Sequence, residues 1–172
     1  MKRAWTWSAT EKANELSCHM EKNRMEIVQI KGQKKDYLAL LLLADEQESM
    51  IDRYLERGEM FAMREGEKTL AVIVVTDEGG GTLEIKNLAV SPDAQKRGYG
   101  RSMVGFVERH FAGRFHTLLV GTGDSPLTVP FYEKCGFVRS HVVRDFFTDN
   151  YDYPIVECGV VLRDMVYLKK RI

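Results

Sequence analysis

The sequence predicts an α+β fold in which a mainly antiparallel sheet is combined with amphipathic helices. Apolar runs bounded by glycine-containing turns predict consecutive strands at residues 59–64, 69–76 and 83–90. Apolar side chains at helical spacing predict helices on either side of these strands, at residues 47–57 and 103–111. The chain has 172 residues, which is enough for one domain with a sizeable core.

Residues 1–24 form a polar extension in front of the predicted domain, which spans residues 25–172. A capping-box pattern in the extension predicts a short helix through about Met20, and an unstructured tail is the alternative. The domain is expected to begin with a short strand at residues 26–30. Asp36 is expected to cap the helix that follows this strand.

Strands and helices continue in the second half of the chain. A short helix is expected from about Thr128 to Cys135, because Pro130 is tolerated in a first helical turn but not in a helix interior. Three strands complete the predicted sheet: residues 117–121, 137–143 and 159–168.

The strand at residues 83–90 shows a change in the phase of its apolar side chains. Leu83 and Ile85 fall on one parity of the strand. Leu88 and Val90, further along, fall on the other. A β-bulge in the middle of the strand produces such a slip. The alternative is a strand buried on both faces, in which parity carries no information.

The composition excludes several classes of protein. With 25 basic and 25 acidic side chains, the net charge is zero, so the sequence indicates neither a nucleic-acid partner nor an anionic membrane. The longest apolar run, residues 38–44, is too short to span a bilayer, and no signal-type segment is found. Cys18, Cys135 and Cys158 match neither a disulfide framework nor a metal site. We therefore expect reduced thiols, no bound metal and a cytoplasmic location.

A glycine-containing corner follows the strand at residues 83–90. Gly98 and Gly100 allow a sharp turn, and the helix after them offers its free N–H groups to an anion. The dinucleotide fingerprint needs a small residue at Met103, and the Walker loop needs Lys and then Ser or Thr after Gly105, so neither pattern fits. The corner predicts a phosphate-bearing ligand of another kind.

The corner matches the Q/R-x-x-G-x-G/A signature, and together with its flanking segments it resembles the GNAT superfamily of acetyl-CoA-dependent N-acetyltransferases. The resemblance covers residues 25–172 and implies a mixed, mostly antiparallel sheet of six or seven strands with helices on both faces and a splayed, bulged central strand. The C-terminal part is similar to a bacterial subgroup of unassigned acceptor. Three segments carry the resemblance: Asn87-Leu88-Ala89-Val90-Ser91-Pro92, Gln95-Lys96-Arg97-Gly98-Tyr99-Gly100 and Phe131-Tyr132-Glu133-Lys134-Cys135-Gly136-Phe137.

The resemblance implies where acetyl-CoA, as co-substrate, would bind. Backbone groups freed by the bulge would bind the pantetheine arm, and the N–H groups of the corner would bind the pyrophosphate. For the basic side chains of the corner, a solvated loop is the alternative to direct phosphate contact. The implied cofactor-binding residues are Leu88, Ala89, Val90, Gln95, Lys96, Arg97, Gly98, Tyr99, Gly100, Arg101 and Tyr132.

Two side chains are catalytic candidates. Tyr132 is implied to face the cofactor sulfur and to protonate the departing thiolate, with a packed helix tyrosine as the alternative. An amine is mostly protonated at neutral pH, because its pKa is about 10.4, so a base or a water relay is needed. Glu84 is implied as that base, and a solvated surface carboxylate is the alternative. The histidines form no catalytic triad, and no base is found for a covalent route through Cys135.

The predicted function is transfer of an acetyl group from acetyl-CoA to a primary amine of a small molecule, peptide or protein, by direct attack. The alternative is a non-catalytic acyl-CoA-binding regulatory or interaction module. The expected state is a monomer or homodimer. Residues 144–157 are too long for a plain hairpin loop, which favours a functional loop. Its carboxylates would attract a cationic amine or be merely solvated: Asp145, Asp149, Asp152 and Glu157.

Overall fold

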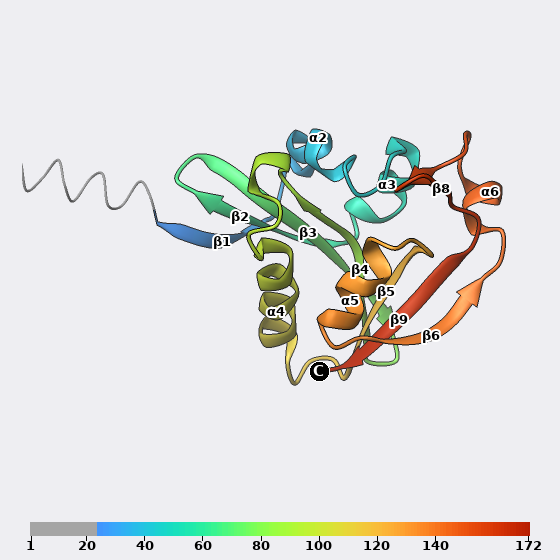
Figure 1. Ribbon diagram of the computed structural model, residues 1–172. Coiled ribbons are helices and arrows are strands. Elements are labelled where there is room, and N and C mark those ends of the chain that lie inside the picture. Colours follow the sequence, from blue (N-terminus) through green and yellow to red (C-terminus); the bar gives the residue numbers. More distant parts are fainter. Residues whose placement is uncertain (1–23) are drawn as a thin grey trace, which may run out of the picture.

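The computed structural model describes residues 24–172, and the helix predicted within the N-terminal extension lies outside the described residues. A seven-stranded mixed sheet runs through this part of the chain in the order β1-β2-β3-β4-β5-β9-β6 (Figure 1). All neighbouring strands are antiparallel except β4 and β5. The strands are β1 (Met25–Ile30), β2 (Glu59–Glu65), β3 (Lys68–Gly79), β4 (Thr82–Val90), β5 (Thr117–Gly123), β6 (Val138–Val143) and β9 (Met165–Arg171).

Helices cover both faces of the sheet, as the resemblance implied (Figure 1). One core cluster joins one sheet face to α4 and α5, and a second joins the other face to α2 and α3. The interior strand β3 is buried on both sides, from Leu70 to Thr76, which accounts for its nearly unbroken apolar sequence. The helices are α2 (Leu38–Leu41), α3 (Glu48–Leu55), α4 (Tyr99–Phe111), α5 (Thr128–Lys134) and α6 (Phe146–Asn150), with 3₁₀ turns η1 (Lys34–Tyr37) and η2 (Pro92–Ala94).

The β-bulge predicted in β4 is present. Asn87 pairs with Val74 of β3, whereas the next residue of β3, Val75, pairs with Ile85. Lys86 is therefore the extra residue, and the bulge explains why the apolar parity changes along this strand. β4 is also buried on both faces from Leu83 to Ile85, as in the alternative, but the bulge interrupts its pairing with β3.

β4 and β5 separate beyond the bulge, so the central strand is splayed. Their parallel pairing covers Thr82 to Ile85 of β4 and ends at Val120 of β5. β4 nevertheless continues to Val90, and β5 continues to Gly123. Because these later segments do not pair with each other, a gap opens between adjacent strands at the centre of the sheet.

The short helix predicted around Pro130 is confirmed as α5. Pro130 lies in its first turn, where the missing N–H breaks no intrahelical hydrogen bond. The helix is followed by Gly136 in a left-handed conformation, at φ 90°. One side of α5 is buried through Val129 and Tyr132, so the sequence places Tyr132 against the sheet.

The C-terminal region differs from prediction in two places. The strand expected at residues 159–168 is divided into β8 (Val160–Val161), which pairs with β7 (Val156–Glu157), and the long β9. Cys158 and Gly159 both have positive φ and form the tight turn between β7 and β8. The segment before β7 contains helix α6, which buries Phe147, so it is not simply a loop.

The predicted cap at Asp36 is wrong. Asp36 lies inside η1, its N–H donates to the carbonyl of Gln33, and its side chain caps no helix. The helix expected at residues 47–57 is confirmed as α3. No helix in the described part of the chain is long and apolar enough to cross a membrane.

Candidate active site

The corner between β4 and α4 presents backbone N–H groups to the gap in the sheet. Gly98 has φ 85° and precedes the first residue of α4. The first intrahelical hydrogen bond runs from the N–H of Ser102 to the carbonyl of Gly98, so the N–H groups before Ser102 have no partner within the helix. The Gln95 amide donates to the carbonyl of Val90 at 3.2 Å and ties the loop to the end of β4. The corner is thus arranged to bind an anion.

A cavity of about 820 Å³ extends from this corner along the gap between β4 and β5. All of the predicted cofactor-binding residues except Arg97 line it, so the fold brings together residues that are separated in sequence. Arg101 and Lys134 also line it, and the Arg101 guanidinium donates to the carbonyl of Lys134 at 2.9 Å. This contact joins the first turn of α4 to the end of α5.

Gly100 keeps the cavity open beside α5. A Cβ atom at this position would lie 3.3 Å from the ring of Phe131 and 3.6 Å from the side chain of Val90. The glycine therefore allows the backbone of α4 to approach both elements closely. A long ligand with an anionic end fits the cavity, because free N–H groups and basic side chains lie at the corner and an uncovered strand edge follows.

Tyr132 lies within the core and also lines the cavity. Its ring packs edge-on against Phe131 and Phe137, with centroids 5.0 Å and 5.5 Å away. Burial, with smaller effects from Cys135 and Glu157, raises the pKa of Tyr132. The hydroxyl is therefore protonated at neutral pH, and it is a weaker acid than a solvated tyrosine.

Glu84 lies on β4 before the bulge, and it does not line the cavity. Its carboxylate is buried and accepts a hydrogen bond from the Lys86 ammonium at 2.8 Å. Burial raises the pKa of Glu84, although Lys86 opposes the shift. Lys86 does line the cavity, so the ion pair connects Glu84 to a side chain of the cavity wall.

A carboxylate that the sequence did not single out, Asp45, lines the far part of the cavity. It accepts hydrogen bonds from the hydroxyl of Tyr151 at 2.9 Å and from that of Tyr54 at 3.2 Å. The Tyr54 hydroxyl in turn accepts a bond from the Asn87 amide at 3.1 Å. Burial raises the pKa of Asp45, and the hydrogen bonds from both tyrosines oppose the shift.

Segment 150–153 folds over the loop between α2 and α3 and holds Asp45 in place. Besides the bond of Tyr151, the Asp152 N–H donates to the Gln47 side chain at 2.9 Å, and the Tyr153 hydroxyl donates to the carbonyl of Glu46 at 2.6 Å. These contacts join parts of the chain about a hundred residues apart. Sequence spacing offers no signal for them, which is why Asp45 was missed.

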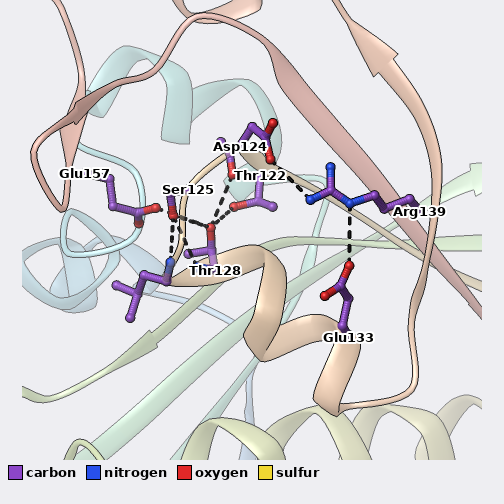
Figure 2. Close-up of polar contacts among 9 residues, drawn as sticks. Thr122, Asp124, Ser125, Thr128, Glu133, Arg139 and Glu157 are labelled. Carbon is purple, nitrogen blue, oxygen red and sulfur yellow. Dashed lines mark hydrogen bonds and ion pairs between the residues drawn. The ribbon is translucent and has the colours of Figure 1, made fainter.

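Among the acidic residues of the predicted functional loop, Glu157 lines the cavity. Figure 2 shows its carboxylate beside Thr128, whose hydroxyl lies 3.3 Å away and also contacts Thr122 and Ser125. Asp145, Asp149 and Asp152 do not line the cavity, and Asp145 pairs with Arg163 instead. The network fixes Glu157 at the N-terminal end of α5.

Comparisons with known proteins agree with this geometry. The profile of the Acetyltransferase (GNAT) domain matches residues 56–139. The uncharacterized N-acetyltransferase YvbK of Bacillus subtilis (strain 168) is 37% identical over 152 residues, which cover 87% of this chain and 97% of that protein.

Two solved structures show a similar fold. A Bacillus subtilis acetyltransferase in complex with CoA is 34% identical, with a TM-score of 0.78, over 87% of this chain and 99% of that one. A GNAT family acetyltransferase from Elizabethkingia anophelis with acetyl-CoA bound is 31% identical, with a TM-score of 0.81, over 86% and 98%.

The chain therefore belongs to the GNAT family of acetyltransferases. It is an acetyltransferase with acetyl-CoA as co-substrate, and the predicted fold, family and enzyme class are confirmed. The alternative of a non-catalytic module is not supported.

Proposed function

We propose that the enzyme acetylates a primary amine on a small cationic molecule or on a peptide. The charge distribution of the cavity supports this proposal. Lys96, Arg101 and Lys134 lie at the end where the anionic part of acetyl-CoA would bind, whereas Asp45 and Glu157 lie at the other. Helix α5 separates the two regions, because Thr128 at its start contacts Glu157 and Lys134 at its end contacts Arg101. Carboxylates at this end favour a cationic acceptor.

In this proposal the backbone holds acetyl-CoA. The N–H groups of the corner would bind the pyrophosphate, and the unpaired edge of β4 at Leu88 and Val90 would bind the pantetheine arm. The Val90 N–H would stabilise the negative charge that develops on the thioester oxygen. Tyr132 would give its proton to the departing thiolate.

We propose that Glu84 accepts the proton of the acceptor amine through a water molecule. A relay is needed because Glu84 is outside the cavity lining and its carboxylate is bound to Lys86. The raised pKa of Glu84 makes it a stronger base than an exposed carboxylate. A covalent route through Cys135 is not favoured, since burial raises the pKa of its thiol and lowers its thiolate fraction.

The experiment is release of free thiol from acetyl-CoA in the presence of polyamines, aminoglycosides, amino acids or peptides. We expect release that depends on an added primary amine. If no amine promotes release while CoA still binds, the proposal of an amine acceptor is wrong.

The Tyr132→Phe variant tests the proposed acid. We expect kcat to fall by about 10²-fold or more, because the thiolate would leave without a proton donor, while CoA binding is retained. Tyr37→Phe is the matched control, since Tyr37 lies outside the cavity lining and its hydroxyl contacts Arg64 of β2. Full turnover by Tyr132→Phe would remove Tyr132 from the mechanism.

We also propose that the enzyme works in the cytoplasm, as a monomer or homodimer. The cysteines of the described part, Cys135 and Cys158, are free thiols, as is usual in a reducing compartment.

A further inference from the structure

Residues 144–164, which we call the flap, form a segment whose two ends are fastened to each other. The N–H of Asp145 donates to the carboxylate of Asp164 at 2.9 Å. Two ion pairs join the same two carboxylates to Arg144 and Arg163, one from each end of the segment. The flap therefore leaves the sheet after β6 and returns to it before β9 through one narrow base.

The flap has a small hydrophobic core of its own. Its three buried side chains, Phe147, Ile155 and Leu162, pack together in a separate cluster, and within residues 24–172 no flap residue belongs to the two main core clusters. Leu162 also lies over Gly123 of β5, next to the base of the flap. Figure 1 shows α6 and β8, which belong to the flap, outside the seven-stranded sheet. Apolar packing thus holds the flap together more than it fixes the flap to the sheet.

Polar contacts attach the outer part of the flap to the rest of the domain. Four hydrogen bonds, which we call the latch, join residues 150–153 to α3 and the loop before it: Tyr151 to Asp45, Asp152 to Gln47, Tyr153 to Glu46 and Asn150 to Arg53. The bond from Tyr151 is half-buried and ends on a carboxylate, whereas the other three are exposed. Water can replace exposed hydrogen bonds at little cost, so the latch can open without disrupting the core.

The flap forms one wall of the cavity, at the end away from the corner. From the flap side the cavity is lined by Phe147, Tyr151, Glu157 and Leu162, and from the opposite side by Asp45 and Glu46. A cationic acceptor attracted by Asp45 and Glu157 would therefore lie between the flap and the rest of the domain. The end where acetyl-CoA would bind, at the corner, is not covered by the flap.

We infer that the flap moves on its base as one unit, and that opening of the latch admits the amine acceptor and releases the acetylated product. This inference rests on the proposed acetylation of an amine. The fastened ends and the separate core let the flap move without unfolding, because the backbone needs to change mainly at the base. With the latch closed, the acceptor would be enclosed beside the thioester during transfer.

Residue-resolved amide hydrogen exchange of the protein without ligand tests the latch. The N–H of Asp152 belongs to the latch, whereas that of Leu162 is bonded inside the flap, to the carbonyl of Ile155 at 2.8 Å. In Tyr151→Phe, exchange should accelerate at least about tenfold at Asp152 and less than about threefold at Leu162, because a bond to a carboxylate is lost only from the latch. Tyr37→Phe is the matched control and should change neither rate.

Two outcomes of the exchange experiment would overturn the inference. Equal acceleration at Asp152 and Leu162 would show that the segment unfolds instead of moving as a unit. An unchanged rate at Asp152 in Tyr151→Phe would show that this hydroxyl does not hold the flap closed. Neither outcome requires a known acceptor.

A reversible cross-link tests whether opening is needed for turnover. Arg53→Cys and Asn150→Cys replace one bond of the latch by two thiols, in a background in which Cys18 and Cys158 are replaced by serine. Joined by a bis(methanethiosulfonate) reagent, this protein should lose at least about tenfold in kcat with an amine that the wild type acetylates, because opening limits entry and release. Dithiothreitol should restore turnover, and calorimetry should show unchanged CoA binding.

Full turnover by the cross-linked protein, with the link verified by mass spectrometry, would overturn the inference and leave the proposed function intact. A cross-linked protein that no longer binds CoA has lost its fold, and the exchange rates then decide alone. If the wild type acetylates no amine, the proposed function fails, and the exchange rates still decide whether the flap moves as a unit.

Discussion

At the scale of single residues, burial decides which polar groups can act. The resemblance implied that Glu84 is a base, with a solvated carboxylate as the alternative, and the structure places it neither at the surface nor in the cavity wall. Asn87 was visible as part of a motif, but only the fold gives its oxygen an unsatisfied, buried position. The partner of Glu84 is the nearby Lys86, whereas Asn87 is bound by Leu41 and Tyr54, which are distant in sequence.

Glu84 should make stability depend on pH. Its pKa is higher in the folded state than in the unfolded state, so over the window between the two values the native protein binds more protons. The contribution of Glu84 is therefore complete below its unfolded pKa and is lost as the pH rises through the folded pKa. Urea unfolding between about pH 4 and pH 8 should show Glu84→Gln gaining stability relative to wild type as the pH rises. A difference that is independent of pH would contradict the raised pKa.

At the scale of elements, the corner between β4 and α4 combines two left-handed residues. Gly98 has φ 85°, which glycine adopts without strain, whereas Lys96 has φ 61° and carries a side chain. Among residues 24–172, and apart from the two residues adjacent in the chain, no atom lies within 4 Å of a Cβ built on Gly98, so a substitution there would test backbone conformation. Substitutions at Gly98 and Lys96 can therefore be compared, because both residues have a left-handed backbone.

Gly98→Ala should lower the free energy of unfolding by about 1–2 kcal/mol, because a Cβ is disfavoured in the left-handed region. Lys96→Gly relieves the same strain but adds backbone entropy to the unfolded chain, so its effect should stay within about 1 kcal/mol. Urea unfolding of both variants measures the difference. Equal destabilisation by the two changes would show that backbone conformation at the corner does not determine their effect on the free energy of unfolding.

At the scale of the whole molecule, the cavity exists because separate parts of the chain converge on the gap between β4 and β5. The corner and α5 form one side, and the loop at Asp45, held by segment 150–153, forms another. A ligand that binds across these parts should stabilise the complete fold.

Addition of CoA at a concentration of about 100 Kd should stabilise the protein by about 2.7 kcal/mol, since the unfolded chain does not bind it. For a chain of this size the Tm should rise by about 5–10 °C in a thermal unfolding scan. In Gly100→Val the shift should be smaller, because the added side chain would press on Phe131 and Val90 in the cavity wall. An identical shift in both proteins would place the CoA site elsewhere.

The sequence by itself determined most of the fold. The phase slip in β4, the helical spacing of α3 and α4, and Pro130 in the first turn of α5 are local patterns, and local backbone chemistry produced the expected elements from each of them. The corner at Gly98 and Gly100 was predictable for the same reason. The division of the last predicted strand at residues 162–164, between β8 and β9, was missed, because this stretch contains no glycine or proline.

The tertiary structure alone decided the end of the cavity that contains Asp45. Asp45, Asn87 and Tyr151 belong to a loop, a strand and the C-terminal segment, and no spacing in the sequence connects them. Their hydrogen bonds and their burial arise only when the chain closes over the second face of the sheet. Local sequence specifies how each segment folds, but solvent exclusion and pairing between distant segments decide which polar groups face the cavity.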